Sequence, residues 1–165
     1  MTLNELNAGD RGRFVAALGW VFEHSPWVAE RAWSRRPFAT RDDLHRAMVH
    51  EVQLAHLDEQ RALLCAHPDL GTKAQMSDAS VGEQASAGLD CLTLADYHRL
   101  KTLTAEYRER FGFPFLLAVK GKATQDVFDA LTTRLRHSAD VEWQEALAQV
   151  ARIAAFRLHD VVESE

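Results

Sequence analysis

Apolar residues recur at steps of three and four along almost all of this 165-residue chain, and this helical periodicity limits the possible folds most. The run that follows Asp10, with Phe14 and Leu18, is one example. Only the stretch FPFLLAV, residues 113–119, resembles a strand, and one strand cannot make a sheet. We therefore predict an all-α fold, with residues 1–165 forming a single-domain helical bundle.

Capping residues predict where the helices begin and end. The stretch TRDD at 40–43 has the form of a capping start, and the long segment that follows it is interrupted near His56. Gly112 supplies a C-terminal cap for the segment that Thr93 opens. Further starts are predicted at Ser25-Pro26, Thr124 and Asp140. The longest segment without periodicity, residues 67–81, is predicted to be a functional loop.

Charge and composition exclude several classes of function. The net charge is −5 and the 19 basic residues are scattered, so we expect no nucleic-acid partner. No apolar run approaches the roughly 20 residues of a membrane helix, so we expect no membrane partner. The opening MTLNELNAGD lacks the pattern of a secretory signal, which favours the cytoplasm. Cys65 and Cys91 lie in apolar patterns and are expected to be buried thiols.

Metal and cofactor sites are not indicated. His45, His50 and His56 are spaced by five and six residues, which is not the four-residue spacing of a helical metal pair. No glycine-rich phosphate loop occurs in the sequence. We therefore expect neither a metal nor a cofactor.

His67 stands where a helical pattern stops, directly before Pro68. A histidine in this position can be structural, because its charged form complements the negative end of a helix. It can also be catalytic, because Pro68 moves it out of the helical conformation and imidazole suits proton transfer near neutral pH.

The stretch SVGEQ, residues 80–84, has two compatible interpretations. Ser80 and Glu83 have the spacing of a capping box. A helix N-terminus also attracts anions, and the amide of Gln84 could both donate to and accept from a planar heterocycle.

Arg157 falls on the apolar stripe of the last helical segment, four residues after Ile153 and four before Val161. Its stem could pack there while the guanidinium reaches water. Alternatively, the guanidinium opens into a cavity and clamps a carboxylate.

Four strings together resemble one family: LLCAHPDLG, SVGEQASAGLD, YRERFGFPFLLAVKG and RIAAFRLHDVV. They resemble the 2-oxo-4-hydroxy-4-carboxy-5-ureidoimidazoline (OHCU) decarboxylases, which act late in urate breakdown. The strings stand in the family's order and span most of the chain. The resemblance implies an all-helical, cofactor-independent lyase, usually a homodimer, that forms S-allantoin and carbon dioxide. Eukaryotic relatives commonly end in a peroxisomal address, whereas this sequence ends in VVESE, so the cytosol remains the expectation.

The resemblance also implies the site residues. His67 resembles the family's catalytic acid, and Pro68 resembles its neighbour that contacts the substrate. Three residues resemble the polar wall of the pocket: Ser80, Glu83 and Gln84. The backbone of five residues resembles the segment that borders the ligand: Phe115, Leu116, Leu117, Ala118 and Val119. Arg157 resembles the arginine that holds an anionic group.

A mechanism follows as a hypothesis. Electrons left by the departing carbon dioxide can flow into the C=N bond of the substrate ring, so no cofactor is required. His67 then delivers or relays a proton and is oriented by Glu83 or shares a proton with it, which makes these two the catalytic pair. Two alternatives remain at this point: a decarboxylase or hydrolase of a related ureido compound, and a non-catalytic helical module for binding or dimerisation.

Overall fold

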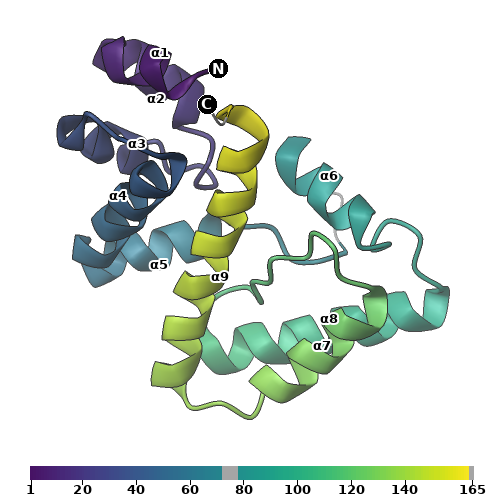
Figure 1. Cartoon of the computed structure of the whole chain (residues 1–165). Helices are drawn as coiled ribbons and strands as arrows, with labels where there is room; N and C mark the ends of the chain where they lie inside the picture. Colours follow the sequence, from purple (N-terminus) through teal and green to yellow (C-terminus); the bar gives the residue numbers. More distant parts are fainter. Residues whose placement is uncertain (72–77, 164–165) are drawn as a thin grey trace. The chain divides into compact units, whose positions relative to one another are not determined.

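The computed structural model describes residues 1–71 and 78–163, and every regular element in these ranges is helical (Figure 1). The all-α prediction is therefore confirmed. Residues 72–77, in the middle of the predicted loop, and the last two residues lie outside the described ranges. The chain divides into two compact units: residues 1–66 with 151–165, and residues 67–150. That residues 1–165 form one domain stays a prediction.

Unit 1 contains the N-terminal helices and the last turns of α9. Its helices are α1 Leu3–Ala8, α2 Arg11–Leu18, α3 Trp27–Ala32, the 3-10 helix η1 Trp33–Arg35, α4 Arg41–Leu54, α5 Leu57–Ala66, and α9 Ala139–Val161 from residue 151 onward. Helix α3 packs on both α2 and α4. Fully buried apolar side chains fill the core of this unit, among them Phe14, Leu18, Phe22, Leu44 and Met48.

Local capping explains the helix boundaries of unit 1. Thr40 and Asp43 form a capping box in which each side chain accepts a hydrogen bond from the other's backbone N–H at 3.0 Å. The predicted interruption near His56 is confirmed, because α4 ends at Leu54 and α5 begins at Leu57. Helix α3 starts as predicted, but Pro26 occupies the N-cap without a side-chain bond, and Ser25 Oγ donates to Glu23 O instead.

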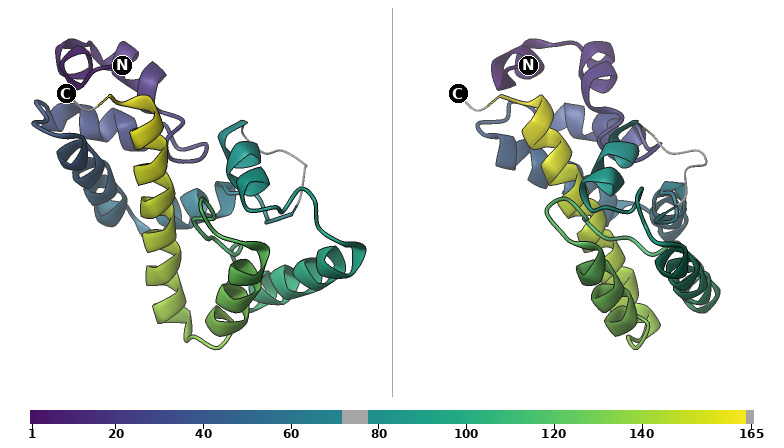
Figure 2. Two further views of the ribbon diagram at one scale, coloured as in Figure 1. Left: turned by 45° about the vertical axis from the view of Figure 1, so that its right-hand side comes forward. Right: turned by 90° about the vertical axis from the view of Figure 1, so that its right-hand side faces the viewer.

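The two ends of the described chain lie side by side in unit 1 (Figure 2). Thr2 and Glu163 form an isolated parallel bridge, and the Met1 amino group lies 3.0 Å from Glu163 Oε1. Arg41 Nη1 donates to Val162 O at 3.0 Å. The last residues of α9 are thereby tied to the start of the chain.

Unit 2 contains α6 Asp78–Ser86, α7 Leu94–Phe111, α8 Thr124–Arg134 and the first turns of α9, up to residue 150. Helices α7 and α8 lie side by side (Figure 1). Helix α7 is capped by Thr93 and ends at Gly112, which takes the left-handed conformation at φ 77°, as the sequence predicts. The segment 113–119 then runs without helix or strand to α8, and its aromatic rings pack against Tyr107.

Two observations complete the fold. Cys65 and Cys91 are both exposed, so the expectation of buried thiols is wrong. Cys65 lies on the exposed side of α5, and Cys91 lies in the connection between α6 and α7. Among the described residues, no helix combines the length and the apolar character that crossing a membrane requires.

Candidate active site

His67 begins unit 2, directly after the last residue of α5. The helix ends where the sequence predicts, and the histidine is buried, with only 5% of its surface exposed. Asp69 fixes the chain two residues further on, because Arg108 Nη2, on α7, lies 3.1 and 3.3 Å from its two carboxylate oxygens. The imidazole is thus carried by a short segment that contacts α7 through Asp69.

Gly71 connects this segment to α6. Its N–H donates to Gln84 Oε1 at 2.8 Å. The backbone has φ 76°, and a Cβ atom at this position would lie 2.9 Å from Leu100 Cδ2. Only glycine suits both the left-handed conformation and the close approach. The structure therefore brings the His67 segment and Gln84 together. The side-chain oxygen of Gln84 already accepts a hydrogen bond from within the protein.

Ser80, Glu83 and Gln84 all lie on α6. Helix α6 begins at Asp78, so Ser80 is inside the first turn and the interpretation of Ser80 as the N-cap is wrong. The helix starts earlier than the S-x-x-E pattern indicates, within a stretch that shows no apolar period. Ser80 and Gln84 are buried and four residues apart, which places them on one face of the helix. Glu83 is half-buried.

The segment Phe115–Val119 is buried along its whole length. Arg134 Nη1, at the end of α8, donates to the Leu116 carbonyl oxygen. Gln149 Oε1, on α9, accepts the Ala118 N–H at 2.9 Å. Two helices of unit 2 therefore fix this segment by hydrogen bonds to its backbone.

Arg134 belongs to a buried cluster of charged and polar groups. Glu142 is fully buried and accepts from Arg134 Nε at 2.7 Å, from the Tyr107 hydroxyl, and from the ring of His137, whose Nδ1 lies 2.9 Å away. Burial, together with the hydrogen bond to Glu142, raises the pKa of Tyr107 far above its ordinary value of 10.0. The phenol therefore stays protonated and remains a donor to the carboxylate at any ordinary pH.

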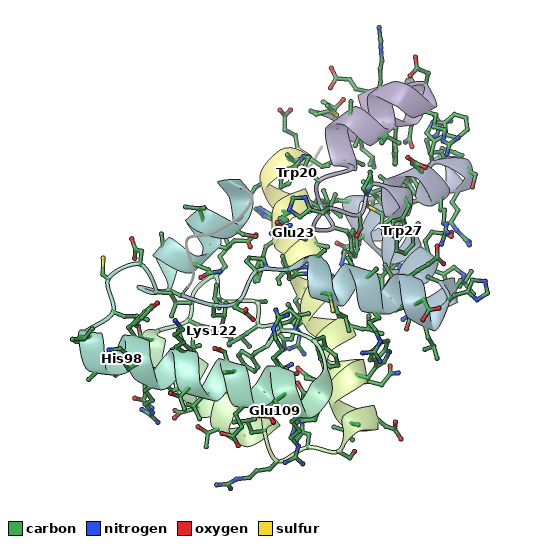
Figure 3. The ribbon with its side chains drawn as sticks, turned by 180° about the vertical axis from the view of Figure 1, so that it is seen from behind. Trp20, Glu23, Trp27, His98, Glu109 and Lys122 are labelled. Atoms are coloured by element: carbon green, nitrogen blue, oxygen red, sulfur yellow. The ribbon has the colours of Figure 1, made fainter. Side chains whose placement is uncertain are left out.

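Arg157 lies in unit 1 and is 3% exposed. Its Nη2 is 2.9 Å from Glu23 Oε2, and its Nη1 donates to the carbonyls of Trp20 and Val21 at 3.4 and 3.3 Å. Figure 3 labels Glu23 and Trp20 beside the last turns of α9. The interpretation in which the guanidinium reaches water is wrong, because a buried carboxylate and two carbonyls hold it inside. The predicted convergence of Arg157 with His67 stays a prediction.

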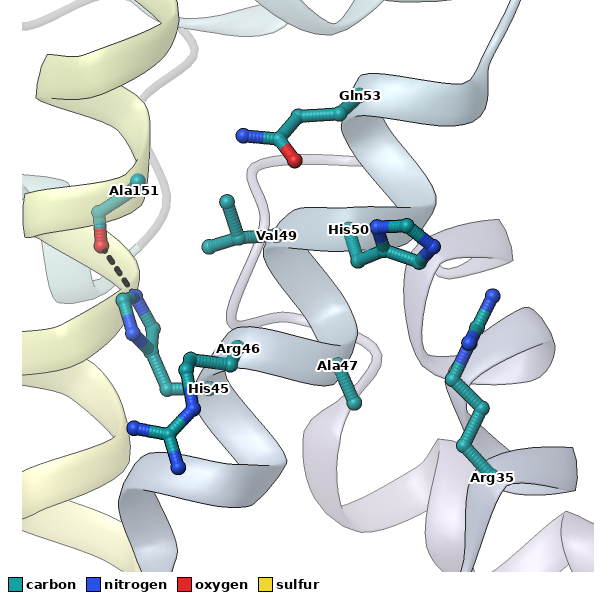
Figure 4. Close-up of a pocket in the computed structure, with 8 residues that line it drawn as sticks. All are labelled: Arg35, His45, Arg46, Ala47, Val49, His50, Gln53 and Ala151. Atoms are coloured by element: carbon teal, nitrogen blue, oxygen red, sulfur yellow. Dashed lines mark hydrogen bonds between the residues drawn. The ribbon is translucent and has the colours of Figure 1, made fainter.

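Unit 1 also contains an open pocket of about 510 Å³ between α4, η1 and α9 (Figure 4). Its polar lining comes from Arg35, His45, Arg46, His50 and Gln53. Three of these side chains are engaged with neighbours: Arg35 pairs with Glu51, Arg46 pairs with Asp43, and His45 Nε2 lies 2.8 Å from Ala151 O. None of the predicted site residues lines it, so we do not place the active site there.

Four buried polar residues that hold the segments described above were not among the predicted site residues: Glu23, Arg134, Glu142 and Gln149. Arg134 follows Leu131 by three residues, so it lies on the buried stripe of α8, the signal that identifies Arg157. Glu142 and Gln149 share the buried face of α9 with Ala146, and that periodicity could have revealed them. Glu23 lies in a turn between α2 and α3, where no periodicity exists to indicate burial.

Comparison with known proteins gives consistent matches. The family model described as OHCU decarboxylase matches residues 7–159. The 2-oxo-4-hydroxy-4-carboxy-5-ureidoimidazoline decarboxylase of Halalkalicoccus jeotgali is 48% identical over 98% of this chain and 92% of its own length. The uric acid degradation bifunctional protein PucL of Bacillus subtilis is 47% identical over 98% of this chain and 33% of its own length. A crystal structure of an (S)-allantoin synthase superposes with a TM-score of 0.81 at 31% identity, covering 99% of this chain and 55% of that one.

Proposed function

The chain belongs to the OHCU decarboxylase family, and from this membership we infer that it is a carboxy-lyase of urate degradation. It converts 2-oxo-4-hydroxy-4-carboxy-5-ureidoimidazoline to allantoin and carbon dioxide. Similarity over nearly the full length of a curated decarboxylase carries this assignment. It also outweighs the alternative of a non-catalytic module.

We propose His67 as the residue that gives a proton to the ring carbon once the carboxylate has left. Its burial supports this role, because a group shielded from water holds its position and transfers its proton without competition from solvent. The Arg108–Asp69 and Gly71–Gln84 contacts support it as well, since they fix the segment that carries the imidazole. Glu83, half-buried on α6, orients the ring or shares its proton.

The remaining groups bind and orient the substrate. Pro68 packs against it, Ser80 and the amide nitrogen of Gln84 face its polar edge, and the Phe115–Val119 backbone reads the amides of the ring and the ureido group. Arg157, already held in place by Glu23, binds an anionic oxygen. Delivery of the proton to one face of the ring gives the S product.

The decisive assay generates the unstable substrate in place with uricase and the hydrolase that follows it. Optical activity of the product then reports whether the protein both accelerates the last step and controls its stereochemistry. We expect S-allantoin at a rate well above the spontaneous one. Racemic product at the spontaneous rate would contradict the assignment, and turnover of a related ureido compound in preference would change the substrate.

His67→Ala tests the catalytic assignment in the same assay. General acid catalysis contributes about 10²–10⁴-fold, so we expect a loss of that order in kcat with an unchanged far-ultraviolet circular dichroism spectrum. His98→Ala is the matched control, because His98 is an exposed histidine of α7 in the same unit (Figure 3). Near-normal turnover of His67→Ala would refute the role of this residue.

We further propose that the protein is a cytoplasmic homodimer, on the basis of the family resemblance. A dimer has twice the chain mass of 18.6 kDa. Sedimentation equilibrium of the untagged protein measures this directly, and a single species at the chain mass would contradict the dimer.

A further inference from the structure

The two hydrogen bonds to the Phe115–Val119 backbone have a geometrical consequence for Leu117, which lies between them. Arg134 binds the carbonyl oxygen of Leu116, and Gln149 binds the N–H of Ala118. In a trans peptide group the C=O and the N–H point in opposite directions. The N–H of Leu117 therefore points away from Arg134, and the C=O of Leu117 points away from Gln149.

Both groups of Leu117 lie on the same side of the segment. Arg134 is paired with Glu142 of α9, and Gln149 lies two turns further along the same buried face of α9. Both side chains therefore reach the segment from the side of α9, and both groups of Leu117 point away from that side. Leu117 is 6% exposed. Within the part of the chain that the structure describes, neither its N–H nor its C=O has a hydrogen-bond partner. Buried backbone groups are almost always paired, so this donor and this acceptor require a partner.

The side chains on the opposite side hold this arrangement rigidly. Glu142 neutralises Arg134 and also accepts hydrogen bonds from Tyr107 and His137. The Arg134 guanidinium also lies 4.5 Å from the centroid of the Phe115 ring. Gln149 is fixed in turn, because its Nε2 donates to Glu145 Oε1 at 2.6 Å. Neither the Arg134 nor the Gln149 side chain can rotate away from the segment without also breaking its hydrogen bond to Glu142 or Glu145.

We propose that Arg134 and Gln149 are positioning residues of the decarboxylase site, which hold the segment so that the N–H and C=O of Leu117 face the ligand as one donor–acceptor pair. This inference rests on the proposed function, in which the segment borders the substrate. A cyclic amide fits such a pair, because its C=O accepts from the Leu117 N–H while its neighbouring N–H donates to the Leu117 carbonyl.

Amide exchange in the wild-type protein, resolved by residue in NMR spectra, tests the pairing without any substitution. In the free protein we expect the Ala118 amide to be protected and the Leu117 amide to exchange at least tenfold faster. Saturation with allantoin should slow exchange of Leu117 at least tenfold and leave Ala118 within twofold. Binding of allantoin with no change at Leu117, or with equal changes at both amides, would overturn the inference.

Gln149→Met removes the acceptor for the Ala118 N–H while keeping an unbranched side chain of similar length. Gln144→Met makes the same chemical change at an exposed position of α9 and serves as the control. We expect Gln149→Met to raise KM about tenfold, since the hydrogen bond to the Ala118 N–H and the alignment of Leu117 are both lost. The kcat should fall less than KM rises, because the proton donor is unchanged.

The outcomes separate this inference from the proposed function. Wild-type protein without decarboxylase activity and without allantoin binding rejects both together. Active wild type with kcat and KM of Gln149→Met within twofold of the control rejects the positioning role alone. If Gln149→Met does not fold, the exchange pattern of the wild type decides.

Discussion

At the scale of single residues, a glycine in unit 2 and a buried ion pair in unit 1 constrain the structure around residues of the proposed site. Gly71 is the clearest example, because its left-handed backbone and its distance to Leu100 both exclude a side chain, and its N–H fixes Gln84. Arg157 is the second example, because a buried carboxylate holds it. Substitution of each residue gives a prediction for the stability of the protein, and substitution of Arg157 also gives one for substrate binding.

Gly71→Ala should destabilise the protein by about 1–2 kcal/mol, the cost of placing an L-residue in the left-handed region, and more where Leu100 cannot move. Urea unfolding measures the change. Gly82→Ala is the matched control, because it lies inside α6 with nothing within 4 Å of the added Cβ, and alanine favours a helix. Equal stabilities of the two variants would contradict the steric argument.

Replacing Arg157 alone should cost about 3–5 kcal/mol of stability, because it leaves Glu23 buried without its ion pair. Arg157→Met combined with Glu23→Met should cost less than the sum of the two single changes, since no charge is stranded. Urea unfolding of the four proteins in this cycle gives the coupling energy. Additive costs would show that the pair is not coupled.

The double variant also isolates the role of Arg157 in binding. If the guanidinium holds an anionic oxygen of the substrate, the folded double variant should show a KM raised at least tenfold, since a hydrogen bond to a charged group contributes about 1.5–3 kcal/mol. A folded double variant with normal kcat and KM would make Arg157 purely structural.

At the scale of elements, local capping determines most helix boundaries, which is why they are readable from the sequence. Thr40, Thr93 and Gly112 act at the predicted ends, since a cap is a bond between neighbours in the chain. Ser80 is the exception, because its capping pattern falls inside a helix that begins earlier. The buried polar residues were only partly predictable. Arg157 and Arg134 share one sequence signal, a position on the apolar stripe of a helix. The burial of Glu23 depends instead on tertiary contacts with α9 that no local pattern encodes.

Thr40→Ala should destabilise the protein by about 1 kcal/mol by uncapping α4. Contacts with Thr40 and then Arg46 hold the pKa of Asp43 below its ordinary value of 3.8. A lowered native pKa stabilises the protein above the ordinary pKa, and this contribution disappears as the pH falls through the native pKa. The difference between wild type and Thr40→Ala should therefore shrink from pH 6 to pH 2, as thermal unfolding at several pH values measures. A difference that grows toward low pH would contradict this assignment.

At the scale of the whole molecule, α9 contributes residues to both compact units. Three tryptophans, Trp20, Trp27 and Trp33, report on unit 1, and Trp143 reports on unit 2. If residues 1–165 form one domain, as the sequence predicts, the two sets should report a single unfolding transition. Fluorescence of Trp143→Phe, compared with a variant in which the other three are phenylalanine, measures the two midpoints. Midpoints more than a few degrees apart would indicate two domains.

The contact between Met1 and Glu163 has a practical consequence for protein engineering. Because Met1 and Glu163 lie side by side, a short peptide can join the chain at these two residues and new ends can be opened in an exposed loop elsewhere, giving a circularly permuted enzyme. The same adjacency suits insertion of the whole sequence into a surface loop of an unrelated host, whose two cut ends lie equally close.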